Sequence, residues 1–287
     1  MDIVYLNGEY LHKKDASISI MDRGFLFGDA VYEVIPYFNG KPLELDAHLS
    51  RLDHSLESVN LHPPLVRSEL HTIFKELTLQ NNLSGKTFSI YLQISRGKQN
   101  TRAHSIPKTY TPTVVAYCMA KNQLQAHEGH KIITLEDTRH DIAQIKTTNL
   151  LSNILLYEQA KQCGAIEAVL LRNNTITECT SSNLFIVKDN QVATPALTPY
   201  MLPGITRQLV IRLCDENNIP CQEKPIKLTD LEQADEIWIT SSTKQICPIT
   251  VLNNKAVGSG NIGSMWHKII KHYNTYKEAW KHKTHEK

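Results

Sequence analysis

The sequence has no hydrophobic run near the roughly 20 residues that a membrane-spanning helix requires. Its first residues, Met1-Asp2-Ile3-Val4-Tyr5, lack the basic start and long apolar core of an export signal, so we expect a cytoplasmic protein without membrane insertion. The six cysteines show no CxxC pair and no His-rich spacing, which argues against a metal site and favours reduced thiols. A net charge of only +2 gives no field suited to nucleic acid.

The remaining composition is that of an ordinary globular protein, with 41% hydrophobic and 21% charged residues. The modest counts of 12 glycines and 12 prolines exclude collagen-like and disordered chains. A chain of 287 residues has the length of about two domains and buries enough apolar surface to fold without disulfides.

The first 120 residues predict hairpins and helices. Asn7-Gly8 and Asn39-Gly40 each separate two short apolar segments, and these dipeptides accept the positive φ angles of tight hairpin turns. Asp46 predicts the cap of a helix that ends before Pro63-Pro64. The expected strands are 4–6, 9–11, 35–38, 42–45, 87–95 and 113–119, and a second helix is expected over 67–80. The last two strands enclose a polar loop, 96–112.

A polar stretch, 121–130, predicts a linker between a smaller domain, 1–120, and a larger one, 131–287. In the larger domain strands and helices intermingle without regular alternation, which predicts an α+β fold. Its expected strands are 167–171, 184–187, 192–194 and 236–240, and its expected helices are 149–163, one after Gly204, one near Asp230 and one from 265. The GxGxxG match at 258–263 has too little chain after it for a dinucleotide site, so we interpret it as a turn before the last helix.

Lys146 is the first candidate catalytic residue. It lies between Ile145 and the apolar side chains of Leu150, Leu151, Ile154 and Leu155. A lysine held near apolar surface can have a lowered pKa, as a Schiff-base nucleophile requires. Most lysines are solvated surface charges, so this candidate needs partners.

Two further segments supply such partners. Glu178 is a lone carboxylate among hydroxyl-bearing and β-branched residues, suited either to a strand end or to pairing with a buried cation. The loop 202–204 enters a helix whose first N–H groups suit a phosphate. In this order, an amine, a carboxylate and a phosphate-binding turn are the parts that pyridoxal phosphate needs.

With these segments the chain resembles the fold-type IV pyridoxal-phosphate enzymes, which include branched-chain aminotransferases, D-amino acid aminotransferases and aminodeoxychorismate lyases. The resemblance covers nearly the whole chain and includes the motifs MDRGFLFGDAVYE at 21–33 and HLSRL at 48–52. It implies a two-domain fold with the site in the cleft between domains, and pyridoxal 5'-phosphate as the cofactor.

The resemblance also implies individual roles. Lys146 would hold the cofactor covalently and move the substrate proton, and Glu178 would keep the pyridine nitrogen protonated. The residues implied in phosphate binding are Arg51, Ile205, Thr206 and Ser242, and those implied beside the ring are Ser182 and Asn183.

Thr101-Arg102-Ala103-His104 in the polar loop resembles the Arg-x-His signature of the D-amino acid aminotransferase branch. There this pair, with the tyrosine matching Tyr32, binds the substrate α-carboxylate, and the loop reaches the neighbouring subunit's site, which implies a homodimer. The expected reaction is transamination between a D-amino acid such as D-alanine or D-glutamate and a 2-oxo acid such as pyruvate or 2-oxoglutarate. A branched-chain L-amino acid aminotransferase, an aminodeoxychorismate lyase and a non-catalytic pyridoxal-phosphate-binding protein remain alternatives.

Overall fold

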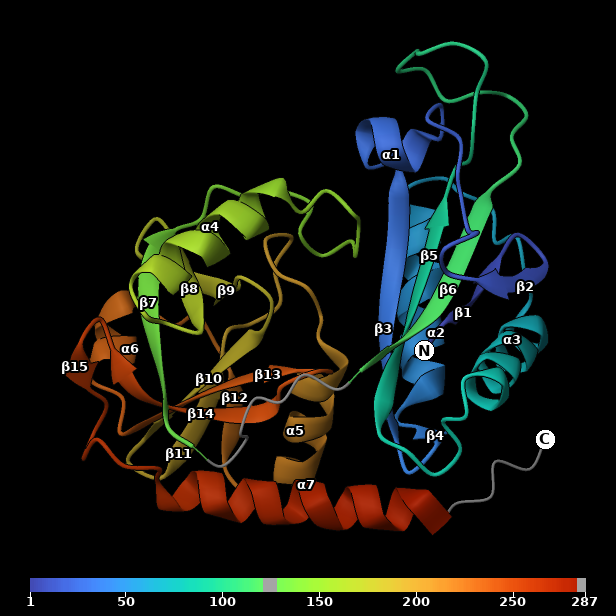
Figure 1. Ribbon diagram of the computed structural model, residues 1–287. Helices are drawn as coiled ribbons and strands as arrows, with labels where there is room; N and C mark the ends of the chain where they lie inside the picture. The colour runs from blue at the N-terminus through green and yellow to red at the C-terminus, as the bar shows by residue number, and fades with distance from the viewer. Residues whose placement is uncertain (121–127, 283–287) are drawn as a thin grey trace. The chain divides into compact units, whose positions relative to one another are not determined.

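The computed structural model describes residues 1–120 and 128–282, the side chains of the last two excepted, and the chain divides into two compact units (Figure 1). Unit 1 comprises Met1–Lys121 and Ile145–Asn149, and unit 2 comprises Asn122–Gln144 and Leu150–Lys287. Most of the linker predicted at 121–130 falls outside the described residues.

Unit 1 is an antiparallel six-stranded sheet in the order β2-β1-β6-β5-β3-β4. Its strands are β1 (Ile3–Leu6), β2 (Glu9–His12), β3 (Ala30–Phe38), β4 (Lys41–Pro42), β5 (Phe88–Ser95) and β6 (Thr113–Ala120). Its helices are α1 (Arg23–Phe27), α2 (Leu45–Ser58) and α3 (Arg67–Gln80). Leucines of α2 and α3, among them Leu49 and Leu77, join Ile35 and Ile90 of the sheet in one buried core.

Unit 2 is built on a nine-stranded mixed sheet in the order β12-β11-β10-β13-β14-β7-β8-β9, with β15 paired to β14. Its strands are β7 (His130–Glu136), β8 (Glu167–Arg172), β9 (Thr175–Cys179), β10 (Asn183–Lys188), β11 (Gln191–Thr194), β12 (Cys221–Glu223), β13 (Glu236–Ser241), β14 (Gln245–Leu252) and β15 (Lys255–Ala256). Its helices are α4 (Leu151–Gln162), α5 (Ile205–Glu216), α6 (Leu228–Glu232) and α7 (Ser264–His282).

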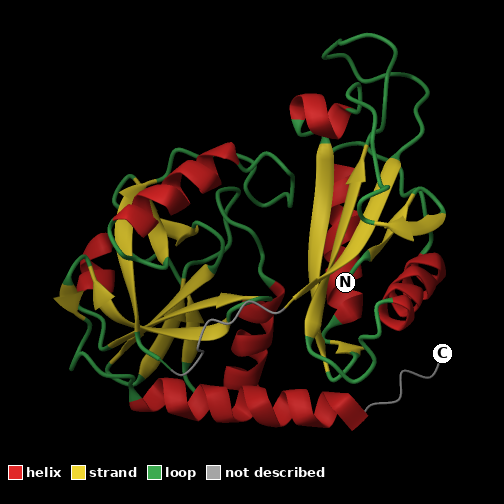
Figure 2. Cartoon of the chain, viewed as in Figure 1, coloured by secondary structure: helices red, strands yellow, loops and turns green. Residues whose placement is uncertain are grey.

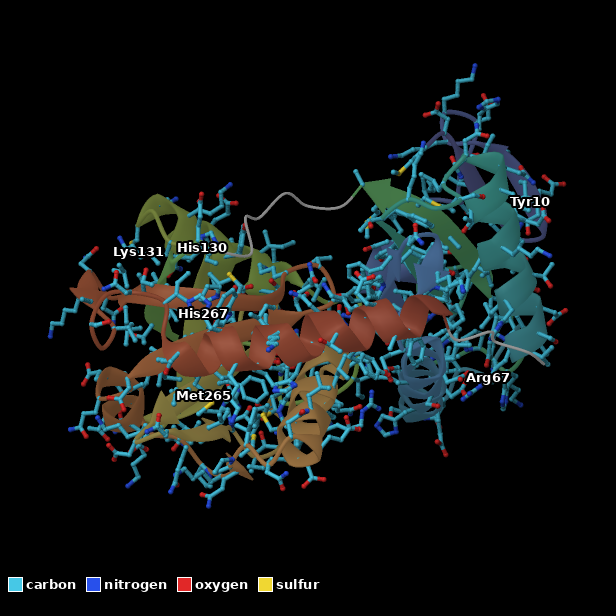
Figure 3. All side chains as sticks on the ribbon, turned by 90° about the horizontal axis from the view of Figure 1, so that it is seen from below. Tyr10, Arg67, His130, Lys131, Met265 and His267 are labelled. Atoms are coloured by element: carbon cyan, nitrogen blue, oxygen red, sulfur yellow. The ribbon has the colours of Figure 1, made fainter. Side chains whose placement is uncertain are left out.

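The helices of unit 2 pack on this sheet in separate places. Leu156 and Ala160 of α4 join Ala168 and Leu170 of β8 in a small core. Helices α5 and α7 contact each other and β13. Glu236 of β13 accepts hydrogen bonds from the N–H groups of Met265 and Trp266 and so caps α7, in whose first turns Met265 and His267 are labelled in Figure 3. Figure 2 shows these helices and the strands of both units.

The hairpin predictions are confirmed. Asn7 and Asn39 have φ of 51° and 53°, and each begins a turn that joins two antiparallel strands. Asn173 and Asp189, with φ of 51° and 49°, begin two further turns of this kind. Asparagine and aspartate tolerate this left-handed region better than most residues.

Two local predictions near the second hairpin are wrong. The strand expected over 42–45 ends at Pro42, and the following helix begins at Leu45 with Glu44 as its cap. Glu44 has a φ of 55° and makes no capping side-chain hydrogen bond, and Asp46 lies inside the first turn instead. The carboxylate of Asp46 still suits the positive end of the helix dipole there. The GxGxxG segment is a turn that leads into α7, as expected, with Gly258 and Gly260 at positive φ.

Candidate active site

Lys146 lies in a five-residue segment that brings the chain back to unit 1 and runs beside β3. Thr147 pairs with Val31 in an isolated antiparallel bridge. The Tyr32 N–H donates to the carbonyl of Lys146 at 3.0 Å. The backbone of this segment is therefore fixed on both sides of the lysine, and Lys146 Nζ lies 4.0 Å from the centroid of the Tyr32 ring.

The apolar cover that the sequence predicted for Lys146 is not what the structure shows. Leu151, Ile154 and Leu155 are 70%, 56% and 56% exposed. They lie on α4 in unit 2, whereas Ile145 packs against the core of unit 1. The helix was expected from residue 149, but Ile145–Asn149 belongs to the other unit and pairs with β3 through Thr147. The apolar neighbour of the Lys146 amine is the Tyr32 ring.

A buried carboxylate holds Arg51 in unit 1. Arg51 Nε and Nη2 donate to the two oxygens of Glu33 at 2.7 and 2.9 Å, and His48 Nδ1 lies 2.8 Å from Glu33. Burial alone would raise the pKa of Glu33, but Arg51 outweighs it and holds the pKa well below its usual range. Burial lowers the pKa of His48, and although the Glu33 carboxylate opposes this, the pKa stays below its ordinary value. Arg51 is thus a buried, oriented guanidinium rather than a solvated helix charge.

Arg102 and His104 lie in the loop between β5 and β6 and are both exposed. The Arg102 guanidinium carbon lies 5.0 Å from the centroid of the Phe27 ring, and the His104 ring lies 5.4 Å from the same centroid. The two predicted carboxylate-binding side chains are therefore neighbours on one ring. Tyr32, Arg51 and Lys146 belong to the same unit of the chain.

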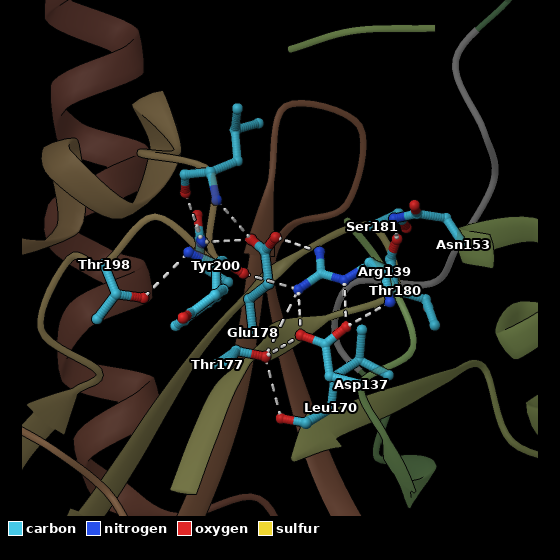
Figure 4. A network of polar contacts seen from close by, with 12 residues as sticks. Asp137, Arg139, Asn153, Leu170, Thr177, Glu178, Thr180, Ser181, Thr198 and Tyr200 are labelled. Atoms are coloured by element: carbon cyan, nitrogen blue, oxygen red, sulfur yellow. Dashed lines mark hydrogen bonds and ion pairs between the residues drawn. The ribbon is translucent and has the colours of Figure 1, made fainter. Parts of the chain in front are cut away.

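Glu178 lies in unit 2, at the end of β9, in the network of Figure 4. Arg139 Nη1 donates to its Oε1 at 2.5 Å. Its Oε2 accepts from Asn183 Nδ2 at 3.1 Å and from the Leu202 N–H at 3.2 Å. Asp137 accepts from Arg139 Nε and Nη2, each at 3.0 Å. Glu178 is therefore a fixed carboxylate that shares its arginine with a second acid.

The sharing affects the ionisation of Glu178. Burial outweighs Arg139 and the Leu202 N–H, so the pKa of this carboxyl is raised to about 7, and the charge of Asp137 adds to the rise. Burial would also raise the pKa of Asp137, but Arg139 outweighs it and lowers that pKa. A cation placed against Glu178 would hold it ionised at neutral pH.

Replacing Glu178 with glutamine tests this ionisation in the cofactor-free protein. In the unfolded chain the carboxyl titrates near its ordinary pKa of 4.5, so wild type loses stability as pH rises from there through about 7. We expect the unfolding free energy of wild type, minus that of Glu178→Gln, to fall by roughly 1 to 3 kcal/mol as pH rises over this range. Urea unfolding at a series of pH values measures it, and a constant difference would contradict the raised pKa.

Asn183 joins Glu178 to the start of α5. Its Nδ2 donates to Glu178 and also to the Leu202 carbonyl at 2.9 Å. A Cβ at Gly204 would lie 1.9 Å from Asn183 Oδ1, so only glycine permits this approach. Gly204 is the N-cap of α5 and makes no side-chain capping bond. The first N–H groups of this helix, at Ile205 and Thr206, are suited to an anion.

A second buried carboxylate, Glu167 of β8, fixes the turn before β10. It accepts from Ser182 Oγ at 2.5 Å and from the N–H and Oγ of Ser181 at 2.8 and 3.1 Å. Lys244 Nζ lies 2.6 Å from it. Burial would raise the pKa of Glu167, but Lys244 outweighs it and lowers that pKa. Lys244 belongs to the turn that carries Ser242, so Glu167 ties two predicted cofactor-binding turns together.

The comparisons with known proteins show the family of the chain. The model of the amino-transferase class IV family matches residues 30–252. The chain belongs to this family. This class IV aminotransferase is 38% identical over 274 residues to D-alanine aminotransferase of Listeria monocytogenes serotype 4b (strain F2365), covering 94% of each chain. It is 36% identical over 264 residues to D-alanine aminotransferase of Bacillus licheniformis, covering 91% of this chain and 92% of the relative.

Among solved structures, the class IV aminotransferase superposes on branched-chain amino acid aminotransferase from Escherichia coli with a TM-score of 0.86 and 26% identity, covering 94% of this chain and 92% of the other. The α+β, fold-type IV prediction is therefore confirmed. Class IV aminotransferases use pyridoxal 5'-phosphate, so the cofactor prediction is confirmed as well.

The residues present fit pyridoxal phosphate. The cofactor needs an amine, an anion for a protonated ring nitrogen and an anion-binding cup. Unit 1 supplies the Lys146 amine on a fixed backbone. Unit 2 supplies Glu178, a buried carboxyl whose pKa stays raised despite the charge of Arg139. It also supplies the start of α5, which no side chain caps.

Sequence reasoning missed the residues that orient these groups, which are Glu33, Asp137, Arg139, Glu167 and Lys244. The pair Arg139–Glu178 is 39 residues apart in sequence, and no local pattern joins them. Glu167 carried a usable signal, because it opens the apolar run Ala168–Leu171 and a carboxylate there needs a cation.

Proposed function

We propose that this class IV aminotransferase catalyses pyridoxal-phosphate-dependent transamination between a D-amino acid, such as D-alanine or D-glutamate, and a 2-oxo acid, such as pyruvate or 2-oxoglutarate. The observation that carries the proposal is the full-length similarity to curated D-alanine aminotransferases at 32 to 39% identity. The paired side chains Arg102 and His104 support it, because an α-carboxylate needs such donors.

Lys146, Glu178 and Arg139 have distinct roles in the proposed reaction. Pyridoxal phosphate, when bound, supplies a ring that withdraws the electrons left at the substrate Cα. Lys146 Nζ holds the cofactor covalently and, once released, moves the proton from Cα. Glu178 keeps the ring nitrogen protonated, and Arg139 keeps the Glu178 carboxylate in place. The 2-oxo acid made from the D-amino acid leaves. A second 2-oxo acid then takes up the amino group by the same steps in reverse.

The phosphate is bound by the residues that the resemblance named. Arg51 offers a guanidinium that Glu33 orients. Ile205 and Thr206 offer N–H groups at the start of α5, and Ser242 offers a hydroxyl. Ser182 and Asn183 line the ring, and Tyr32, Arg102 and His104 bind the substrate carboxylate.

We further propose that the enzyme is a homodimer. Leu151, Ile154 and Leu155 form an apolar stripe at i, i+3 and i+4 of α4, and all three are more than half exposed. Such a stripe on a helix is typical of a face that a partner covers.

We propose that the protein works in the cytoplasm. Its six cysteines are free thiols, which suits a reducing compartment. Within the described residues, no helix is both long and apolar enough to span a bilayer.

Steady-state turnover tests the proposed reaction. The purified protein, loaded with pyridoxal phosphate, should form pyruvate and glutamate from D-alanine and 2-oxoglutarate, with glutamate of the D configuration by chiral chromatography. L-Leucine in place of D-alanine should give little turnover. Turnover of L-leucine alone would instead favour a branched-chain L-amino acid aminotransferase. The structural similarity to the Escherichia coli enzyme is the reason for testing this alternative.

A further inference from the structure

The loop that carries Arg102 and His104 has no regular secondary structure, and Figure 2 shows it beside the short helix α1. Three side chains gather on Phe27 at the end of this helix. The guanidinium carbons of Arg102 and Arg23 both lie 5.0 Å from the Phe27 ring centroid. The His104 ring approaches it edge-on at 5.4 Å, with an interplanar angle of 70°. Phe27 is thus the common contact of the loop's two functional side chains.

Arg23 fixes the backbone of the same loop. Its Nη1 donates to the carbonyls of Ala103 at 2.8 Å and Ser105 at 3.3 Å, and Nη2 donates to that of His104 at 3.4 Å. Nη1 also donates to Gln99 Oε1 at 2.9 Å, while Gln99 Nε2 donates to Ala103 O at 3.0 Å. Carbonyls that flank both functional residues therefore depend on one guanidinium.

Arg23 is itself held in place. It is 4% exposed, and its Nε donates to Asp29 Oδ2 at 2.6 Å. Burial would raise the pKa of Asp29, but Arg96 and Arg23 outweigh it and lower that pKa, so the anchor stays ionised at neutral pH. Asp22 caps α1 at the Gly24 N–H and accepts from Ser95 Oγ at 2.7 Å, which fixes the helix on the end of β5.

We propose that Arg23 and Phe27 are positioning residues that preassemble the substrate-carboxylate receptor, Arg102 and His104, before substrate binds. Neither touches substrate. Arg23 sets the path of the loop backbone, and Phe27 sets the direction of the two side chains. The ligand of this receptor is the carboxylate of a small molecule. This inference rests on the proposed function. A receptor held in its binding geometry loses less conformational entropy when the carboxylate binds.

The test compares two phenylalanines of the same helix in the holoenzyme. Phe27→Leu removes the ring that contacts the receptor, and Phe25→Leu removes an exposed ring as the matched control. The readouts are KM and kcat for D-alanine and the inhibition constant of propionate, a carboxylate that cannot be transaminated. We expect Phe27→Leu to raise KM and the propionate constant together by about 3- to 30-fold. Its kcat should change less than twofold, and Phe25→Leu should match wild type.

Two more variants sharpen the result. Phe27→Tyr keeps the ring and should restore both constants, whereas Arg23→Lys cannot span the loop carbonyls and should behave like Phe27→Leu. Phe27→Leu constants equal to those of Phe25→Leu would overturn the inference. So would a joint loss of kcat, cofactor absorbance and thermal stability, because that pattern marks a structural role alone. A wild-type enzyme that turns over L-leucine but not D-alanine would overturn the proposed function instead, and the propionate constant would still test the positioning.

Discussion

Replacing Lys146 with alanine should lower transamination of D-alanine by roughly 10²- to 10⁴-fold from the loss of proton transfer alone. The residue lies on a backbone segment bonded to β3 at Tyr32 and Ala30, so the substitution should not disturb the fold. Its amine contacts the Tyr32 ring. None of the other unit 1 side chains that we assign to the site is a lysine. No other assigned residue can therefore take over its proton transfer.

The measurement is the rate of pyruvate formation, with Lys161→Ala as the control. Lys161 is an exposed lysine on α4 paired only loosely with Glu158 at 3.5 Å, and its loss should leave the rate unchanged. Borohydride treatment of wild type followed by peptide mapping should place the cofactor's mass on the peptide that contains Lys146. Mass on a different lysine, or full activity of Lys146→Ala, would refute the assignment.

Replacing Arg102 with alanine should raise KM for D-alanine about 10- to 150-fold. A hydrogen bond to a charged group contributes about 1.5 to 3 kcal/mol, which corresponds to that range. The Arg102 side chain is exposed and contacts the Phe27 ring. Its removal should therefore lower the stability of the protein only a little. Arg102→Lys keeps the charge but not the forked geometry, and we expect an intermediate KM.

Steady-state kinetics with varied D-alanine at saturating pyridoxal phosphate measures this effect. Arg67→Ala is the matched control, because Arg67 is an exposed arginine of the same unit that pairs with Asp53 at 2.6 Å. If Arg102→Ala and Arg67→Ala have the same KM, the carboxylate receptor lies elsewhere. The branch assignment would then lose its support from this loop.

Local patterns predicted most elements of this fold. The helix expected over 67–80 has those bounds, and the strand expected over 236–240 extends one residue further. The helix carries apolar residues at three- and four-residue steps, and the strand carries the short continuous apolar run Ile237–Ile239. The turns at Asn7 and Asn39 were predictable because few residues tolerate their positive φ.

Longer-range features were not predictable. β14 lies at the centre of the larger sheet, between β13 and β7, yet it contains Pro248 and shows no clean alternation. Helix α1 has only five residues and depends on a cap whose aspartate also bonds Ser95, 73 residues away. Strand order in a mixed sheet depends on pairings between segments distant in sequence, which no single segment encodes.

The candidate site divides in the same way. Lys146, Glu178 and Arg51 could be named because their motifs resemble a known family. Their orienting partners could not, since Glu33 lies 18 residues from Arg51 and Arg139 lies 39 from Glu178. A buried charge needs a partner, but sequence alone does not say which one.

Pyridoxal phosphate bound to Lys146 should accept the amino group of a D-amino acid. The most direct test is the visible absorption spectrum of the purified protein, recorded before and after D-alanine and, in a separate sample, L-leucine. We expect a yellow band of protein-bound cofactor that D-alanine bleaches and L-leucine leaves in place. A band bleached by L-leucine alone, or no band after incubation with pyridoxal phosphate, would contradict it.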